Sequence, residues 1–190
     1  MKHLFIIILF FSLINSIAQD KIYLDKDWKK TTEDKAHFYR VLEKKSDSLF
    51  YIEDYYISGK MQMDGYFSNL EKETLVGKIN WYDEQGIITI TKTYTKGILN
   101  GDYIEYANGK VIAKGNYKNG EFYDGILISS SIYSFAFSEY KKGKRIKGIA
   151  YYSNPTNIAK ERYYSYDNKG KEYPTKDVFY DKKSQIIGTP

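Results

Sequence analysis

The sequence predicts a mainly β protein: an elongated antiparallel β-meander of about five hairpin repeats of 23–24 residues, with a capping hairpin at its N-terminal end. Three observations support this fold class. The 190-residue chain holds 21 Tyr, 10 Phe and 2 Trp but only 3 Pro, and aromatic side chains favour strands. Tyrosine and glycine recur at fixed spacings, and apolar residues alternate ahead of the tyrosines, as in strands with one buried face.

These patterns divide the chain into four parts. We assign residues 1–18 to a signal peptide, 19–54 to a lead-in with the capping hairpin, 55–164 to the β-repeat region, and 165–190 to a C-terminal cap and tail.

The N-terminal segment has the pattern of an export signal. Lys2 and His3 precede an apolar run at residues 4–14, and Ser16-Ile17-Ala18 supplies the small residues that signal peptidases recognise. We expect cleavage before Gln19. An uncleaved anchor is the alternative, but the run is shorter than the roughly 20 residues that cross a bilayer. The expected location is the periplasm and cell envelope, or the extracellular space.

Composition limits the possible functions. Cleavage removes one charged side chain, Lys2, so the 29 Lys and Arg become 28 against 24 Asp and Glu. This mild, unclustered charge does not indicate a nucleic-acid-binding surface, and we expect no nucleic-acid partner. The chain has no cysteine, which excludes a cysteine-anchored lipoprotein, a thiolate zinc site and a thiol nucleophile.

Three columns of residues define the repeat. Tyr94, Tyr117, Tyr140 and Tyr163 are 23 residues apart; Gly97, Gly120 and Gly143 keep the same step; and Gly77, Gly101, Gly125 and Gly148 step by 24, 24 and 23. Asn108-Gly109 and Asn119-Gly120 are dipeptides that accept the positive φ of tight hairpin turns. We expect each column tyrosine to stack on the tyrosine of the next unit.

Both ends of the repeat region differ from the pattern. Residues 36–44 and 48–57 flank a polar turn and predict the capping hairpin, and "IYL" at 22–24 predicts a short strand ahead of it. Beyond Tyr164 the pattern weakens; "VFY" at 178–180 predicts one last strand before a loose tail.

Two units of the repeat region are irregular. "FSNLEKETLVG" (67–77) is three residues longer than its counterpart, and "SSSIY" (129–133) replaces a Tyr-x-x-Gly turn; each is either a decayed repeat or a partner site.

The segments "GNYKNGEFYDG" and "YIEYANGK" resemble the bacterial MORN-repeat variant family, and the match covers about residues 55–164. The lead-in segments "IYLDKDW", "AHFYR" and "SGKMQMDG" are similar to those of exported members. The resemblance implies the β-meander and a role in binding a partner. Some cytosolic relatives are labelled antitoxins, and eukaryotic MORN proteins are often placed at membranes. No defined site residues carry over from the family.

No catalytic constellation is visible. After cleavage His37 is the only histidine, and no convergent partners for a metal or acid–base site accompany it. The acidic pairs are interpreted as solvated turn and edge charge: Asp25/Asp27, Glu53/Asp54, Glu71/Glu73 and Asp83/Glu84. We therefore expect no cofactor, no metal and no enzymatic activity.

The densest basic run is "KKGKRIK", which supplies the candidate binding residues Lys141, Lys142, Lys144, Arg145 and Lys147, with the nearby Tyr140, Tyr151 and Tyr152. These residues could hold an anionic lipid head group or an acidic glycan. The alternative is a soluble loop between repeats.

Taken together, the sequence predicts an exported, non-enzymatic module that binds a protein partner or has a structural role, with antitoxin-like or immunity-like activity among its possible roles. The second hypothesis is a peripheral membrane or anionic-glycan binder.

Overall fold

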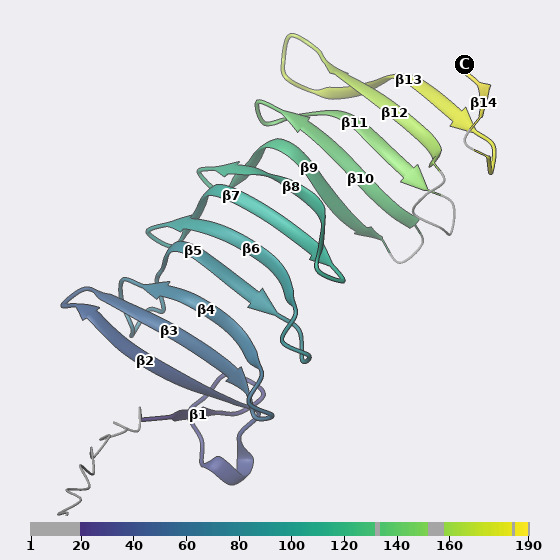
Figure 1. The fold of residues 1–190 in the computed structure, drawn as a ribbon. Helices are drawn as coiled ribbons and strands as arrows, with labels where there is room; N and C mark the ends of the chain where they lie inside the picture. The colour runs from purple at the N-terminus through teal and green to yellow at the C-terminus, as the bar shows by residue number, and fades with distance from the viewer. Residues whose placement is uncertain (1–19, 132–133, 152–157, 184, 190) are drawn as a thin grey trace, which may run out of the picture.

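In the computed structural model, which describes residues 20–131, 134–151, 158–183 and 185–189, the chain forms one open antiparallel sheet of 14 strands. Each strand pairs with the next in sequence, so the hydrogen-bonded order is simply β1 to β14 (Figure 1). The predicted mainly β fold and its elongated meander are confirmed. The expected signal peptide, its cleavage site and Tyr152 lie outside the described residues.

The strands are β1 (Ile22–Leu24), β2 (Phe38–Ser46), β3 (Leu49–Tyr56), β4 (Met61–Phe67), β5 (Leu75–Tyr82), β6 (Ile88–Thr95), β7 (Ile98–Ala107), β8 (Lys110–Lys118), β9 (Glu121–Ser131), β10 (Ser134–Lys141), β11 (Lys144–Tyr151), β12 (Ile158–Tyr166), β13 (Glu172–Tyr180) and β14 (Ile186–Gly188). A single 3₁₀ turn, η1 (Glu33–Lys35), interrupts the loop between β1 and β2. The predicted strand at 22–24 and the capping hairpin, now β2 and β3, are confirmed.

Hairpin turns are as tight as the sequence predicts. Asn108 and Gly109 both have positive φ, as do Asn119 and Gly120. The turn glycines also connect successive units, because their N–H groups donate to carbonyl oxygens of the strand before: Gly97 to Leu75 at 2.9 Å, Gly120 to Leu99 at 2.8 Å, and Gly143 to Tyr123 at 2.7 Å.

One β-bulge accompanies the tyrosine position of every unit. The pairing register shifts between Asp64/Tyr66, Lys92/Tyr94, Asn116/Tyr117, Glu139/Tyr140 and Tyr163/Tyr164. On their other side the column tyrosines pair with the second glycine column: Tyr94 with Gly77, Tyr117 with Gly101, and Tyr140 with Gly125. These three glycines have φ of 74°, 125° and 113°, a region that other residues rarely adopt. The two sequence columns are therefore cross-strand partners.

The expected direct stacking of column tyrosines is wrong for Tyr117 and Tyr140. The ring of Phe122 lies between them, with centroids 5.2 Å from Tyr117 and 5.3 Å from Tyr140, both in edge-on geometry. Tyr103 contacts Tyr117 in the same manner at 5.6 Å. The aromatic of the intervening strand completes the ladder, because strands of successive units are separated by a return strand.

Both clusters of the buried core lie on one face of the sheet. The cross-strand row Arg40, Asp54, Met63, Trp81 and Ile90 marks this face, which we call the Arg40 face. It holds two apolar clusters, one of Ile52, Met63, Phe67 and Ile79 and one of Tyr103, Ala113 and Phe122. Because no second layer covers the described sheet, each cluster is built only from neighbouring strands.

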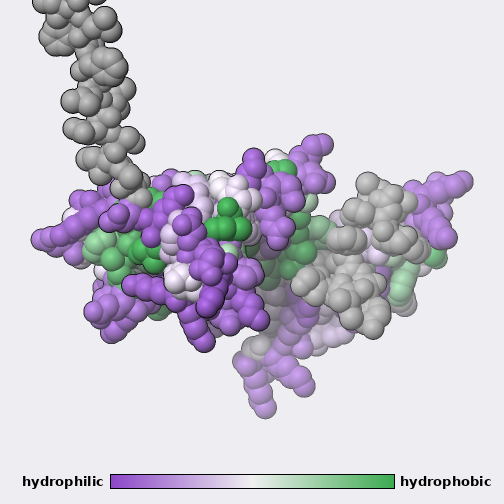
Figure 2. Space-filling view, turned by 90° about the horizontal axis from the view of Figure 1, so that it is seen from below, coloured by the Kyte–Doolittle hydropathy of each residue, from purple (hydrophilic) through white to green (hydrophobic). Residues whose placement is uncertain are grey.

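Polar groups hold the opposite face over the same strands. The carboxylate of Asp64 accepts hydrogen bonds from Tyr51 (3.2 Å), Tyr82 (2.7 Å) and Asn80 (3.1 Å), while the hydroxyl of Thr91 donates to Asn80 at 2.9 Å. Burial, together with the Asp64 carboxylate, raises the pKa of Tyr51 to about 12. Figure 2 views the molecule from the β1 end; hydrophilic side chains cover most of the visible surface, with hydrophobic groups showing in patches between them.

The C-terminal part differs from the prediction. The last predicted strand at 178–180 extends to the whole of β13, and the expected loose tail contains β14. Polar residues fill the first part of β13, so no apolar alternation revealed it. Ion pairs to the preceding strands, Arg162 with Asp177 and Arg145 with Glu172, take the place of apolar packing there. Over the described residues, no helix is long and apolar enough to cross a membrane.

Replacement of Gly115 by alanine should destabilise the protein by about 1–3 kcal/mol, because the new Cβ would lie 2.2 Å from the Asp124 carbonyl oxygen and 2.4 Å from Phe122. Urea unfolding would measure the change. Gly188→Ala is the matched control, since a Cβ there meets nothing within 4 Å, and it should stay within about 0.5 kcal/mol. Equal stability of the two variants would contradict the close packing described here.

Candidate functional site

The predicted basic run lies at the hairpin that joins β10 to β11. Lys141, Lys142 and Lys144 are exposed around this turn. Lys142 has a φ of 52°, and its backbone N–H donates to the Asp124 carboxylate at 2.8 Å. The Nζ of Lys144 lies 4.8 Å from the ring centroid of Tyr166. Three of the five predicted cations therefore face solvent together.

The other two cations are paired with carboxylates. The Arg145 guanidinium donates to both oxygens of Glu172 and lies 4.0 Å from the Tyr164 ring centroid. Lys147 donates to Glu161 at 3.1 Å. The hydrogen bonds from Arg145 hold the pKa of the Glu172 carboxyl below its ordinary value. Arg145 and Lys147 also lie on opposite faces of the sheet. Because of the β-bulge, they pair with two consecutive residues of β10, Tyr140 and Glu139, whose side chains alternate between the faces.

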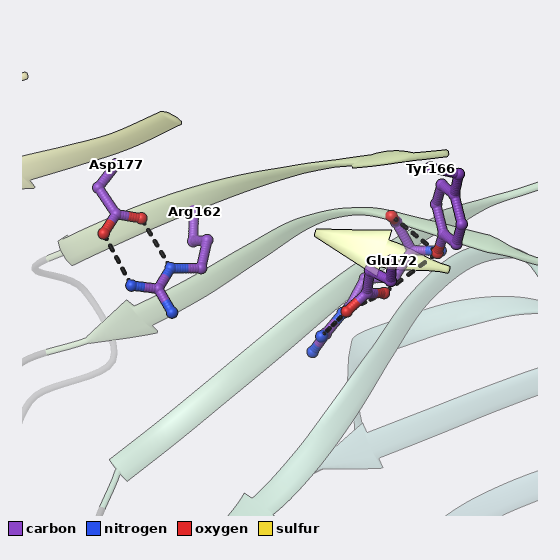
Figure 3. Close-up of polar contacts among 5 residues, drawn as sticks. Arg162, Tyr166, Glu172 and Asp177 are labelled. Carbon is purple, nitrogen blue, oxygen red and sulfur yellow. Dashed lines mark hydrogen bonds and ion pairs between the residues drawn. The ribbon is translucent and has the colours of Figure 1, made fainter. Parts of the chain in front are cut away.

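Of Tyr140 and Tyr151, the predicted tyrosines that the structure describes, Tyr140 is the cross-strand partner of Arg145. Tyr140 packs on Phe122 in the second core cluster, and Tyr151 contacts Phe137 with ring centroids 5.4 Å apart. The cations beside Arg145 are also paired. Figure 3 shows Arg162 bound to both oxygens of Asp177, at 2.7 and 2.8 Å, and Tyr166 donating to Glu172 at 3.1 Å. This region is a network of internal ion pairs.

Histidine and acidic residues form no cluster suited to a metal in the part of the chain that the structure describes. His37 lies just before β2 and is exposed. Asp25 and Asp83 organise turns, as the interpretation of turn charge predicts, because each accepts hydrogen bonds from two backbone N–H groups. The same interpretation is wrong for Asp54, which is buried and paired with Arg40.

A different site, which the sequence analysis missed, lies on the Arg40 face near the N-terminal end. It is a cleft of about 350 Å³, which we call the Trp28 cleft, within the range of about 300–1,000 Å³ usual for ligand sites. Its lining residues are Trp28, Arg40, Asp54, Gln62, Met63, Phe67, Glu73, Leu75 and Trp81. Both tryptophans of the chain are among them.

A buried ion pair forms the polar base of the Trp28 cleft. Arg40 Nε and Nη2 donate to the two carboxylate oxygens of Asp54 at 2.7 and 2.8 Å, and Nη1 donates to Glu73 at 2.5 Å. Burial opposes ionisation of Arg40, but the two carboxylates outweigh it and raise the pKa of the guanidinium. Burial raises the pKa of the Asp54 carboxyl, although Arg40 acts against this shift. Both Asp54 oxygens are occupied by Arg40, so this carboxylate is not arranged as a free general base.

Trp28 reaches the cleft from a turn built around Asp25. The Asp25 carboxylate accepts hydrogen bonds from the backbone N–H groups of Asp27 at 2.8 Å and Lys29 at 3.0 Å. The backbone N–H of Trp28 donates to the Asp25 carbonyl oxygen. One face of the indole stacks on Phe38 with centroids 4.3 Å apart, and 41% of the residue stays exposed.

The same turn occurs at Asp83 and Asp167, where the position equivalent to Trp28 is a glycine. Gly86 and Gly170 have φ of 79° and 80° and donate to the carbonyls of Asp83 and Asp167 in the same pattern. Trp28 adopts a φ of 61° at this position. A bulky residue in this conformation costs on the order of 1–3 kcal/mol, so the local sequence does not favour tryptophan here.

Backbone strain is concentrated at the cleft. Six non-glycine residues have positive φ in the described ranges, and four of them precede a glycine in hairpin turns: Lys96, Asn108, Asn119 and Lys142. The other two, Trp28 and Glu73, both line the Trp28 cleft. Strained conformations of this kind cluster at functional sites, which makes the cleft the principal candidate.

Glu73 comes from the irregular unit that the sequence analysis singled out. The connection between β4 and β5 is closed by Ser68 N–H donating to the Thr74 carbonyl at 2.8 Å and by Thr74 N–H donating to Asn69 at 3.0 Å. It brings Glu73 to Arg40, 33 positions earlier in the chain. The extra residues thus have a structural use, because they place Glu73 beside Arg40.

Removing Arg40 alone should cost about 3–5 kcal/mol of stability, because Asp54, whose side chain is 1% exposed, would be left unpaired. Denaturant unfolding of Arg40→Leu tests this, and the double variant Arg40→Leu/Asp54→Leu should recover most of the loss. Arg162→Leu is the control: its side chain is 41% exposed and its partner Asp177 keeps Lys160, so its effect should be much smaller than that of Arg40→Leu.

Stability should fall as the pH drops below 4.5, in part through Glu161. Burial opposes its ionisation, but hydrogen bonds from Tyr180, Lys147 and Tyr163 hold the pKa of this carboxyl below its ordinary 4.5. A lowered folded pKa gives stability that is present above the ordinary value and is lost as the pH falls through the folded one.

Thermal unfolding of Glu161→Gln between pH 6 and 3 should therefore show a smaller pH dependence of Tm than the wild type. Gln substitution of Glu71, which is exposed in the β4–β5 connection, should keep the wild-type dependence. A wild-type slope in Glu161→Gln would contradict the assignment.

No protein-family model matches the chain. A search of curated proteins likewise finds no match.

Proposed function

We propose that the protein is an exported, non-enzymatic binding module whose recognition surface is the Trp28 cleft. The observation that carries this proposal is the placement of Trp28 and Glu73, which occupy strained backbone conformations outside the hairpin turns and line the same cleft. The resemblance to the MORN-repeat variant family and the expected signal peptide support a binding role outside the cytosol. None of the column tyrosines lines the cleft, so the repeats act as its scaffold.

Charge arrangement supports binding rather than catalysis. The Arg40 guanidinium and the Asp54 carboxylate saturate each other in a two-bond pair, and Glu73 bonds to the same guanidinium. Side chains held in this way can position and orient a ligand. Proton transfer, in contrast, would require breaking a buried ion pair. The antitoxin-like and immunity-like roles expected of some relatives are specific forms of this binding function.

The second candidate, a membrane or anionic-glycan surface, has narrower support. Lys141, Lys142 and Lys144 are exposed together at one hairpin, but Arg145 and Lys147 are neutralised by Glu172 and Glu161. Three solvated lysines give an attraction that salt screens strongly.

Capture experiments distinguish the two surfaces. Immobilised protein of residues 19–190 should retain a partner from an envelope or medium extract of its own source. Trp28→Gly should reduce this retention at least about tenfold, whereas Lys141→Glu/Lys142→Glu/Lys144→Glu should leave it unchanged. The sister turns with Gly86 and Gly170 show that this turn accepts glycine, so Trp28→Gly is expected to fold. If retention is lost only in the lysine variant, the binding surface is the hairpin between β10 and β11 and not the Trp28 cleft.

A further inference from the structure

We propose that the Trp28 cleft binds a sugar ring of a neutral carbohydrate; this rests on the proposed binding function and specifies its partner. The cleft combines aromatic walls, a few fixed polar groups and balanced charge. A pyranose ring offers the complementary chemistry: C–H faces for aromatic contact and hydroxyl groups at its edge.

The charge of the site disfavours an ionic ligand. Arg40 is balanced by Asp54 and Glu73, and a second cation, Lys92, has its Nζ 5.6 Å from the centroid of the Trp81 ring. The Trp81 ring already has Lys92 beside it, and the Phe67 ring has Arg40 at 5.1 Å. An incoming cation would meet these like charges, and an incoming anion would meet Glu73, whose side chain is 56% exposed.

Large apolar surfaces line the same space. Trp28 approaches from the loop between β1 and β2, Trp81 lies on β5, and Phe67 and Met63 lie on β4. Stacking on Phe38 fixes the plane of the Trp28 indole while 41% of the residue remains exposed. A fixed, partly exposed indole gives contact area at low entropic cost, which suits a flat apolar ring face.

Two polar side chains of the cleft have acceptor atoms that a ligand could reach with hydrogen-bond donors. Gln62 lines the cleft, and its buried Oε1 has no hydrogen-bond partner among the described residues. A buried acceptor without a donor costs free energy until a donor reaches it. Glu73 accepts from Arg40 through Oε1 and can take further donors at its rim position. Sugar hydroxyl groups are neutral donors and match both acceptors.

A neutral peptide is the competing occupant, but it fits less well. Its backbone would bring a carbonyl for each N–H, and the identified acceptors on Gln62 and Glu73 match only the donors. The exposed lysines of the β10–β11 hairpin would favour acidic glycans instead, so the charge of the ligand separates the two sites.

The test uses the two tryptophans as internal probes, because both line the cleft. Protein of residues 19–190 is titrated with neutral oligosaccharides of glucose, mannose and N-acetylglucosamine, and with a sulfated oligosaccharide and a neutral peptide library for comparison. We expect a saturable shift of tryptophan emission with at least one neutral oligosaccharide, unchanged between 50 and 500 mM salt.

Matched variants locate the binding. Trp28→Gly and Gln62→Met should each weaken the affinity for that oligosaccharide at least about tenfold, measured by calorimetry. Tyr173→Ala, which removes an aromatic residue that is 44% exposed on β13, should leave it unchanged. Unfolding curves confirm that each variant is folded before it is titrated.

The outcomes separate the two proposals. Failure of every neutral oligosaccharide, or binding of the sulfated one alone, overturns the carbohydrate assignment. If a Trp28-dependent partner is still captured, or the peptide library shifts the emission, the binding function stands with a different ligand. If neutral saccharide binding survives in Trp28→Gly and Gln62→Met, the cleft is not the site.

Discussion

The β-bulge beside each column tyrosine is the feature on which the rest of the sheet depends. A sheet with no second layer must bury apolar side chains against its own neighbouring strands, and it can do so only if it twists strongly. A bulge increases the local twist, and the repeats have one at this position and a second register shift besides, as at Trp81/Tyr82 and Glu105/Tyr106. The positive φ of Gly101 and Gly125, directly opposite Tyr117 and Tyr140, gives the backbone the freedom that this geometry requires.

The sheet is finished differently at its two ends. At the C-terminal end the apolar core is replaced by ion pairs such as Arg162 with Asp177, and the last strand, β14, has only three residues. Pro174 lies within β13, where it cannot donate to a further strand. At the N-terminal end β1 is equally short, but its loop turns over the Arg40 face and supplies Trp28. Short edge strands discourage pairing with other chains, so both ends limit open-edge association.

The sequence was informative wherever structure is local. Hairpin turns at Asn108 and Asn119 follow from residue preferences, and the β-meander follows from the period of the tyrosines. The Trp28 cleft could not be predicted in the same way, because Trp28, Arg40 and Glu73 come together only through the register of several strands and one long connection. One signal was present: the segments at Asp25, Asp83 and Asp167 share a turn pattern, and only the first has tryptophan in place of glycine. Reading the turns as a set would have marked Trp28.

The cost of the cleft is the strongest argument that it is used. A tryptophan in a left-handed conformation, a glutamate in the same region, a buried arginine–aspartate pair and a buried carboxamide oxygen without a donor each reduce stability or add nothing to it. The equivalent turns at Asp83 and Asp167 show that glycine, which adopts this conformation without strain, fits the position of Trp28. Elsewhere on the same face, Ile52 and Ile79 fill comparable space with fully buried apolar groups. Since the unfavourable choices meet at one place and face one cavity, a shared ligand explains them better than four independent defects of packing would.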